Sequence, residues 1–253
     1  MSTEPSAPSV TTEDPRQDSR IRHSSPDAIP RTGAAALPPS GAGTRRGFNR
    51  GVAAFFDVAA RAYDLGSLQR VVYQPPQDEM IEFLRANGAR RIVDIGCGTG
   101  ILTARIAREL RPDAVYGIDM SPGMLAQAHR RSTDVQWRNE PAEQLGLAAE
   151  SVDAVVTTTA FHFFNQPVAL AEFHRVLIPG GLLTISALNL RSRWSAPVQR
   201  LSGTRLSPAA TPSPQQMRDL IAAAGFQLIE QRSVRRPWYS RTVPDVITMA
   251  QRR

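Results

Sequence analysis

Residues 91–100 read RIVDIGCGTG, a short apolar run that leads directly into three glycines at alternate positions. The apolar run is typical of a buried strand, and the glycines permit a tight turn and a close approach of a ligand to the backbone. Leu102, Ile106 and Leu110 follow at helical spacing, so a helix begins next to the last glycine. Because the first turn of a helix has free N–H groups, we expect a ligand site at this strand–helix junction.

The alternation of strand and helix continues along the chain. Short apolar runs predict seven strands, at residues 91–95, 114–119, 135–137, 152–158, 182–187, 226–230 and 246–249. Helical spacing and end signals predict helices between them, at 102–110, from Pro122 after Ser121, at 169–176, and at 214–224 before Gly225. This pattern predicts an α/β fold: a Rossmann-like, doubly wound, mostly parallel seven-stranded sheet with helices on both faces.

The first 47 residues differ in composition from the rest of the chain. They are rich in Pro, Ser, Thr, Ala and Gly and have almost no aromatic or β-branched apolar residues. Such a segment buries too little apolar surface to offset its ordering entropy, so we predict a disordered tail over residues 1–47. The folded domain then covers residues 48–253 and opens with an apolar stripe at helical spacing that includes Phe55, Phe56 and Tyr63.

The composition excludes several kinds of site. Cys97 is the only cysteine and the four histidines are scattered, so the chain forms no internal disulfide and no zinc cage of thiolates and imidazoles. All 30 basic residues are arginines, which excludes a lysine Schiff base and a Walker lysine. The net charge of +7 is spread along the chain rather than gathered in a stripe, so nucleic acid is not an expected partner.

Targeting and membrane signals are weak. No apolar run approaches the roughly 20 residues that a membrane helix needs, so we expect no stable membrane insertion. The first 30 residues carry five acidic side chains and lack the apolar segment of a secretory signal. Together with the single cysteine, these features predict a reducing, cytoplasmic location.

The glycine pattern separates two classes of nucleotide cofactor. A nicotinamide-binding turn needs G-x-G-x-x-G/A, and counting from Gly96 the third small residue falls at Ile101, which disfavours a dehydrogenase. Asp119 ends the second predicted strand, 19 residues after Gly100. A carboxylate there can accept hydrogen bonds from two ribose hydroxyls, although it is also a favourable charge at the start of the next helix.

Four segments in order carry a resemblance to a known family. They read VDIGCGTG at 93–100, GIDMSPGML at 117–125, SVDAVV at 151–156 and RVLIPGGLLTIS at 175–186. The chain resembles the class I S-adenosylmethionine-dependent methyltransferases over about residues 50–230. It is most similar to the small-molecule branch that includes quinone-biosynthesis and trans-aconitate-type enzymes. The resemblance implies a methyltransferase domain over residues 48–253, with its cofactor-binding core at about 89–190.

The resemblance also implies roles for single residues in binding S-adenosylmethionine. The glycine loop, with Gly96, Cys97, Gly98 and Gly100, would line the methionine and ribose part. Asp94 would hold the methionine amino group, directly or through water. Two further residues complete this side: Asp119 would take the ribose hydroxyls, and Met120 would pack on the adenine. The thiol in this loop is interpreted as a small apolar filler without chemistry.

The adenine segment departs from the family pattern. The family often has G-D-A-x-x-L after the third strand, where this chain has EPAEQL at residues 140–145. Pro141 stands in place of the aspartate and has no backbone N–H to offer. Ala142 could still offer its N–H group, and Glu140 or Glu143 could compensate for the missing carboxylate.

The acceptor side would be built from three segments. The fourth predicted strand runs into TTTAFHFF at residues 157–164, where His162 is the candidate general base. Alternatively, His162 packs among the phenylalanines as a space-filling core residue and has no catalytic role. Tyr63 belongs to a Tyr-Asp pair that often folds over the cofactor in this family, and residues 188–213 would contribute arginines to an acceptor wall or form a solvated loop.

The sequence therefore predicts an S-adenosylmethionine-dependent methyltransferase that acts on an O, N or C atom of a small molecule, with no metal. The alternatives are a non-catalytic regulator or scaffold that binds the same cofactor and a nucleic-acid or protein methyltransferase. The latter is disfavoured because nucleic-acid amino methyltransferases usually carry an N/D-P-P-Y/F segment after the fourth strand. The acceptor and the oligomeric state are not predicted.

Overall fold

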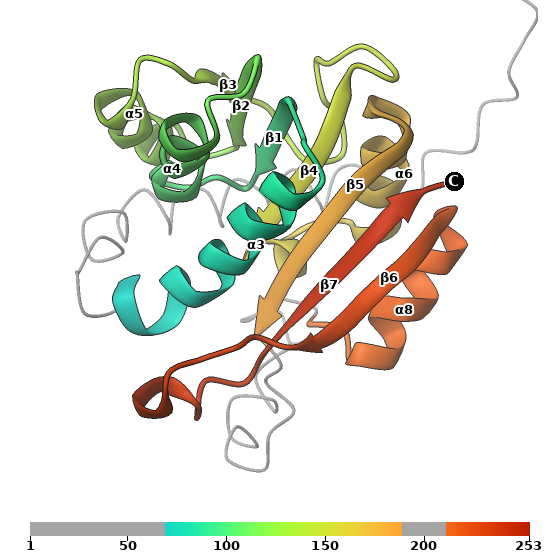
Figure 1. The fold of residues 1–253 in the computed structure, drawn as a ribbon. Helices are drawn as coiled ribbons and strands as arrows, with labels where there is room; N and C mark the ends of the chain where they lie inside the picture. The colour runs from blue at the N-terminus through green and yellow to red at the C-terminus, as the bar shows by residue number, and fades with distance from the viewer. Residues whose placement is uncertain (1–68, 189–210) are drawn as a thin grey trace, which may run out of the picture. The chain divides into compact units, whose positions relative to one another are not determined.

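A computed structural model describes residues 69–188 and 211–253 of the chain, and these form helices on a seven-stranded sheet (Figure 1). The strands are β1 (Arg91–Ile95), β2 (Ala114–Asp119), β3 (Gln136–Asn139), β4 (Val152–Thr158), β5 (Leu177–Leu188), β6 (Phe226–Ser233) and β7 (Asp245–Arg252). The helices are η1 (Gln69–Tyr73), α3 (Gln74–Ala86), α4 (Ile101–Leu110), α5 (Pro122–Arg131), η2 (Phe161–Phe163), α6 (Gln166–Val176), α8 (Pro214–Ala223) and η4 (Trp238–Ser240).

The sheet confirms the predicted fold class. Its strand order is β3-β2-β1-β4-β5-β7-β6, and β1 to β5 pair in parallel. Only β7 runs against its neighbours β5 and β6, so β6 points in the same direction as β1. Strand order reverses at β1, between β2 and β4, which is the position where doubly wound sheets bind ligands outside their carboxyl ends.

Helices cover both faces of the sheet, as predicted (Figure 1). On one face, α3 and α4 bury Met80, Leu84 and Ile106 against the sheet. On the other, α6 and α8 bury Phe173 and Ile221, which are both at most 1% exposed. Fully burying one such side chain contributes roughly 1.5–3 kcal/mol to stability.

Local signals in the sequence explain where two helices begin. In α5 the hydroxyl of Ser121 accepts the N–H of Met124 at 3.0 Å, and Pro122 occupies the first turn. Ser213 and Gln216 form a reciprocal capping box at the start of α8. Both caps satisfy N–H groups that would otherwise be unpaired.

Three features were not predicted. Helix α3 and the π-helical turn η1 before it precede β1, and β5 begins at Leu177, five residues earlier than expected. The early start is possible because Pro179, Gly180 and Gly181 form an irregularity, after which the β4–β5 register shifts. Strands β6 and β7 are also longer than predicted, because they pair with each other along their whole length.

Several predictions lie outside the described residues. They are the disordered tail at 1–47, the helical stripe with Phe55, Phe56 and Tyr63, and most of the 188–213 segment. Among the helices that the structure describes, none has the length and apolar character needed to cross a membrane.

Candidate active site

A cavity opens at the carboxyl ends of β1, β2 and β4, with about 1070 Å³ of empty space including its open mouth. Its walls come from five segments of the chain: η1 and α3, the loop after β1, the start of α5, the residues after β3, and the residues after β4. Eight of the predicted site residues line it: Asp94, Gly96, Cys97, Gly98, Asp119, Met120, Ala142 and Glu143.

The glycine loop is held against β2 by its backbone. The N–H groups of Gly96 and Cys97 both donate to the carbonyl of Ile118, at 2.8 and 3.1 Å. Gly96 has a φ of +71°, and a Cβ there would lie 2.4 Å from the Cβ of Ala160. The loop therefore packs against the end of β4 at a point where only glycine fits.

The other two loop glycines have different surroundings. A Cβ on Gly100 would lie 2.4 Å from the ring of Trp137, so Gly100 allows close packing beneath the loop and does not line the cavity. A Cβ on Gly98 would meet no atom nearer than the sulfur of Met124 at 4.0 Å, and both residues line the cavity. Gly98 thus leaves open space on the side where a ligand would approach the backbone.

Asp119 connects the glycine loop to α5. One carboxylate oxygen accepts the N–H of Gly98 at 2.8 Å, and the other accepts the N–H of Ser121 at 2.8 Å. Charge-assisted hydrogen bonds of this kind are stronger than neutral ones. The carboxylate is therefore fixed in the cavity wall, next to the loop and the first turn of the helix.

Asp94 is a buried carboxyl in the same wall. It is 2% exposed, and the hydroxyl of Thr103 donates to it at 2.6 Å. Burial raises the pKa of Asp94 to about 7, the nearby Asp119 adds to the rise, and the Thr103 hydrogen bond opposes it. A cation bound beside Asp94 would favour its ionised form.

Cys97 lies between these carboxyls. Burial raises the pKa of the Cys97 thiol, and the negative charges of Asp94 and Asp119 raise it further. The group is therefore a thiol at neutral pH, in agreement with its interpretation as an apolar filler.

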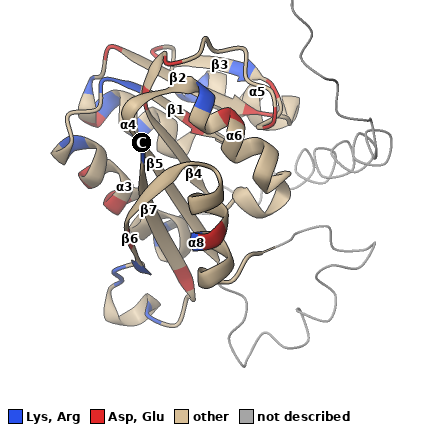
Figure 2. Cartoon of the chain, turned by 90° about the vertical axis from the view of Figure 1, so that its right-hand side faces the viewer, with Lys and Arg blue, Asp and Glu red and all other residues tan. Residues whose placement is uncertain are grey.

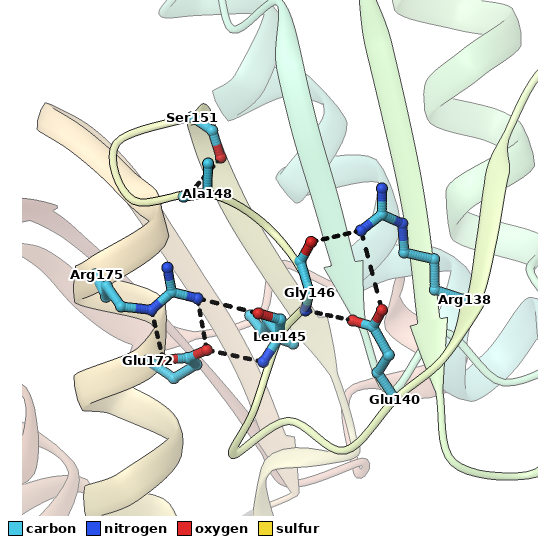
Figure 3. Close-up of polar contacts among 8 residues, drawn as sticks. All are labelled: Arg138, Glu140, Leu145, Gly146, Ala148, Ser151, Glu172 and Arg175. Carbon is cyan, nitrogen blue, oxygen red and sulfur yellow. Dashed lines mark hydrogen bonds and ion pairs between the residues drawn. The ribbon is translucent and has the colours of Figure 1, made fainter. Parts of the chain in front are cut away.

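Several hydrogen bonds fix the segment after β3 (Figure 3). Glu140 accepts the N–H of Gly146 at 2.8 Å, and Glu172 of α6 accepts the N–H of Leu145 at 2.8 Å. Arg175 donates to the carbonyl of Leu145 at 3.0 Å and pairs with Glu172. These contacts hold the loop at the cavity rim, where Glu140 and Ala142 lie.

Glu143 is engaged with another element in the same way. Its carboxylate accepts the N–H of Asn165, just before α6, at 2.6 Å. Pro141, at the family's aspartate position, is not among the lining residues and has no backbone N–H to donate. Glu140 and Glu143 are the acidic groups at this end of the cavity.

The end of β4 supplies uncharged and aromatic residues. Thr158, Thr159, Ala160, Phe163 and Phe164 line the cavity. Thr159 has a φ of +53°, an unfavourable backbone conformation of the kind that concentrates at functional sites. The sequence had suggested this segment as the acceptor side.

His162 lies in the same segment but not on the cavity wall that the structure describes. Burial lowers the pKa of His162 to about 4, so the imidazole is neutral at physiological pH. Its Nδ1 atom is buried without a hydrogen-bond partner, and its ring packs on Phe163 with centroids 4.0 Å apart.

Two lining residues had no sequence signal that identified them. Tyr73 ends η1 and Gln77 lies in the first turns of α3. The segment has Pro75 and Pro76 in a polar surrounding, and prolines in a first turn are a helix-start signal that could have located it. Tyr63, the predicted lid residue, lies outside the described residues.

Comparisons with known proteins agree with this geometry. A family profile described as "Methyltransferase domain" matches residues 93–185. The malonyl-[acyl-carrier protein] O-methyltransferase of Serratia marcescens is 30% identical over 207 residues, which cover 78% of this chain and 74% of that protein. The chain belongs to the class I S-adenosylmethionine-dependent methyltransferases.

Other methyltransferases match in part. The demethylmenaquinone methyltransferase of Beutenbergia cavernae is 32% identical over 64% of this chain and 67% of that enzyme. Magnesium protoporphyrin IX methyltransferase of Synechocystis, solved with bound SAH, has the same fold, with a TM-score of 0.62 at 19% identity over 83% of this chain and 98% of its own. The chain spans only about half the length of several other curated relatives that it matches.

The cavity of this chain fits the cofactor of the family. S-adenosylmethionine carries a sulfonium, an ammonium and a ribose with two hydroxyls, which are groups that carboxylates bind. The cavity has four carboxyl side chains, on Asp94, Asp119, Glu140 and Glu143, together with the open side of Gly98. Apolar residues, among them Met120, Met124 and Ile118, complete the walls.

Proposed function

We propose that this protein transfers the methyl group of S-adenosylmethionine to an O, N or C atom of a small molecule. The observation that carries the proposal is the pairing of Gly98 and Asp119 at the carboxyl edge of the sheet. The carboxylate of Asp119 accepts the N–H of Gly98 and fixes the loop, while the missing side chain of Gly98 leaves room for a ligand. The relatives named demethylmenaquinone methyltransferase and malonyl-[acyl-carrier protein] O-methyltransferase support methyl transfer as the activity.

We assign the cofactor-binding roles as follows. Asp94 would hold the ammonium group, since its buried carboxyl gains a counter-charge there. Asp119 would accept the ribose hydroxyls with its carboxylate, which the N–H groups of Gly98 and Ser121 fix in the cavity wall. Met120, Ala142 and Glu143 would surround the adenine, with Gly96, Cys97 and Gly98 along the methionine.

Methyl transfer depends mainly on the alignment of the acceptor atom with the methyl group of the cofactor. When bound, S-adenosylmethionine supplies a methyl group on an electron-poor sulfur. The chain would hold the acceptor against it from the side of Thr158, Phe163 and Phe164, and would exclude water. His162 is neutral and would be a weak base, so we assign the transfer to alignment rather than to proton removal.

Binding and turnover are tested separately. S-adenosylmethionine or S-adenosylhomocysteine at 100 times its Kd should stabilise the protein by about 2.7 kcal/mol, a thermal shift of a few degrees, and NAD should not. Release of S-adenosylhomocysteine with a panel of hydroxylated aromatic and carboxylic acceptors then reports catalysis. Thermal shifts without release of S-adenosylhomocysteine for any acceptor would favour a non-catalytic regulator that binds the cofactor.

We also propose a reducing, cytoplasmic location for the protein, whether it is an enzyme or a regulator, because the chain has a single cysteine.

A further inference from the structure

The connection between β6 and β7, residues 234–244, lies at the same edge of the sheet as the cavity. Strand β6 runs parallel to β1 and β4, because β7 is antiparallel to both β5 and β6. The carboxyl end of β6 therefore meets the edge where β1 and β4 end. The red turn at the lower left of Figure 1 is this connection, and it projects beyond the strands.

Two large aromatic side chains stand on the turn in solvent. Trp238 is 81% exposed and Tyr239 is 52% exposed, and their rings meet edge to face with centroids 5.9 Å apart. The other exposed large hydrophobic residues of the described chain are all aliphatic and at most 49% exposed. A paired, exposed tryptophan and tyrosine marks an interaction surface more than a single exposed leucine would.

The turn is also basic. Residues 234–244 contain three arginines and no acidic residue, and Arg232 lies just before them at the end of β6. Arg232 pairs with Glu79 and Glu230, and Arg236 pairs with Asp245. Arg235 and Arg241 flank the aromatic pair in the sequence and are both exposed, and no ion pair is found for them in the part of the chain that the structure describes. Figure 2 colours the arginines of the whole described chain blue.

Buried contacts of Arg235 and Arg236 with neighbouring elements hold the turn in place. Arg236 and Asp245 form an ion pair in which both side chains are 2% exposed, and Arg236 also donates to the carbonyls of Val71 and Val72 in η1. The N–H of Arg235 donates to Glu79 of α3. Since buried pairs of this kind are costly to break, the aromatic residues are exposed on a fixed support and not on a loose loop.

The geometry points to docking of this turn on an anionic lipid bilayer. Tryptophan and tyrosine have an apolar body and a polar tip, and they concentrate at the headgroup level of membranes. Arginines on both sides complement anionic headgroups. A protruding tip meets a flat surface without a matching groove, whereas an acidic protein partner would have to supply a pocket for Trp238.

The consequence for the site follows from the shared edge. Docking through residues 235–241 would turn the carboxyl edge of the sheet, and the cavity mouth with it, toward the bilayer. The contact would be weak and reversible, because two aromatic residues and two arginines bury little surface.

The test is co-sedimentation of the full chain with vesicles of phosphatidylcholine alone or with 30% phosphatidylglycerol, at low and high salt. Two double variants remove the surface: Trp238→Ser with Tyr239→Ser, and Arg235→Gln with Arg241→Gln. The matched control is Arg85→Gln with Arg130→Gln, which removes two exposed arginines elsewhere. Thermal unfolding checks that every variant is folded.

We expect salt-sensitive binding to the anionic vesicles and little binding to phosphatidylcholine. Removing both arginines of the turn should lower the partition coefficient by roughly tenfold to thirtyfold, and the aromatic variant should lower it similarly. The control variant, Arg85→Gln with Arg130→Gln, should change the logarithm of the partition coefficient by less than half of the change caused by Arg235→Gln with Arg241→Gln. Equal losses in the control, or no sedimentation with either vesicle, would overturn the proposal, and retention on immobilised polyglutamate without vesicle binding would assign the turn to an acidic protein instead.

Discussion

The two sides of the cavity are built from different chemistry. On the side of β1 and β2, the carboxyl groups of Asp94 and Asp119 lie in the last residues of these strands, next to a glycine loop whose open side at Gly98 faces the cavity. On the side of β4, threonines and phenylalanines face the cavity, and Tyr73 and Gln77 join them from η1 and α3. The first side suits a cationic, hydroxylated ligand, and the second suits an uncharged surface, which is the division that a cofactor and a separate acceptor require.

The strongest test of the carboxylate side is Asp119→Asn. An amide in this position can no longer accept hydrogen bonds at both ends, so either Gly98 or Ser121 loses its partner. The affinity for S-adenosylhomocysteine should fall by about 10- to 100-fold, because hydrogen bonds to a charged group contribute roughly 1.5–3 kcal/mol. Calorimetric titration measures the change.

Asp113→Asn is the matched control for this substitution. Asp113 is exposed and pairs with Arg90 far from the cavity wall. Its replacement should leave the affinity within twofold, since exposed pairs contribute little. An equal loss in both variants would mean that Asp119 acts only through general stability.

Gly98→Ala tests whether the loop leaves room for a ligand. Gly98 has a φ of +55° and Gly88 has a φ of +65°, and a Cβ at either position clears the protein. Both alanine variants should lose roughly 1 kcal/mol of stability from the backbone alone. Only Gly98→Ala should also weaken cofactor binding, by about tenfold, because the new methyl group would overpack the bound state. Similar binding by both variants would remove Gly98 from the site.

The titration of Asp94 gives a pH dependence on the same side. Its folded pKa of about 7 lies above the unfolded value of about 3.9. The folded state therefore holds the proton longer, and the contribution of Asp94 to stability falls as the pH rises from about 4 to about 7. Binding of a cation favours the ionised form, so the cofactor affinity should rise close to tenfold from pH 6 to pH 8.

Asp94→Asn separates these two effects. The amide keeps an acceptor for Thr103 without the cost of a buried charge. Its thermal midpoint relative to the native protein should rise between pH 5 and pH 8, while its cofactor affinity should be lower and nearly independent of pH. A pH-dependent affinity that persists in this variant would assign the titration to another group.

The smallest effect is expected on the other side, for His162→Phe. The imidazole is neutral, has an unpaired buried Nδ1, and is absent from the described cavity wall. Cofactor affinity and turnover should change by less than about threefold, whereas loss of a general base would lower turnover by about 10²–10⁴-fold. A loss of that size with unchanged affinity would restore His162 as the base.

The two sides of the cavity also differ in how far the sequence predicts them. Asp94 lies at the end of β1, Asp119 ends β2 and the glycine loop follows β1 directly, so strand patterning and glycine spacing, with the family resemblance, were enough to place them together. The β4 segment was found, but its orientation depends on packing: Phe163 and Phe164 face the cavity, while His162 between Phe161 and Phe163 does not. Tyr73 and Gln77 reach the wall only through the position of α3 on the sheet, which no local pattern encodes.

Within the loop, spacing alone could not separate the glycines. Gly98 lines the cavity and Gly100 packs beneath it on Trp137, a residue of β3 that lies 37 positions later in the sequence. The antiparallel β7 was also outside the prediction, because strand direction depends on connections and edge pairing rather than on apolar alternation.

The most direct measurement is calorimetric titration of the native protein and of Asp119→Asn with S-adenosylhomocysteine at pH 8, with NAD as the control ligand. We predict one site per chain for S-adenosylhomocysteine, a 10- to 100-fold weaker site in the variant, and no heat of binding for NAD. Equal binding by the two proteins would contradict the placement of the cofactor beside Asp119, and the absence of binding to the native protein would contradict the proposed function itself.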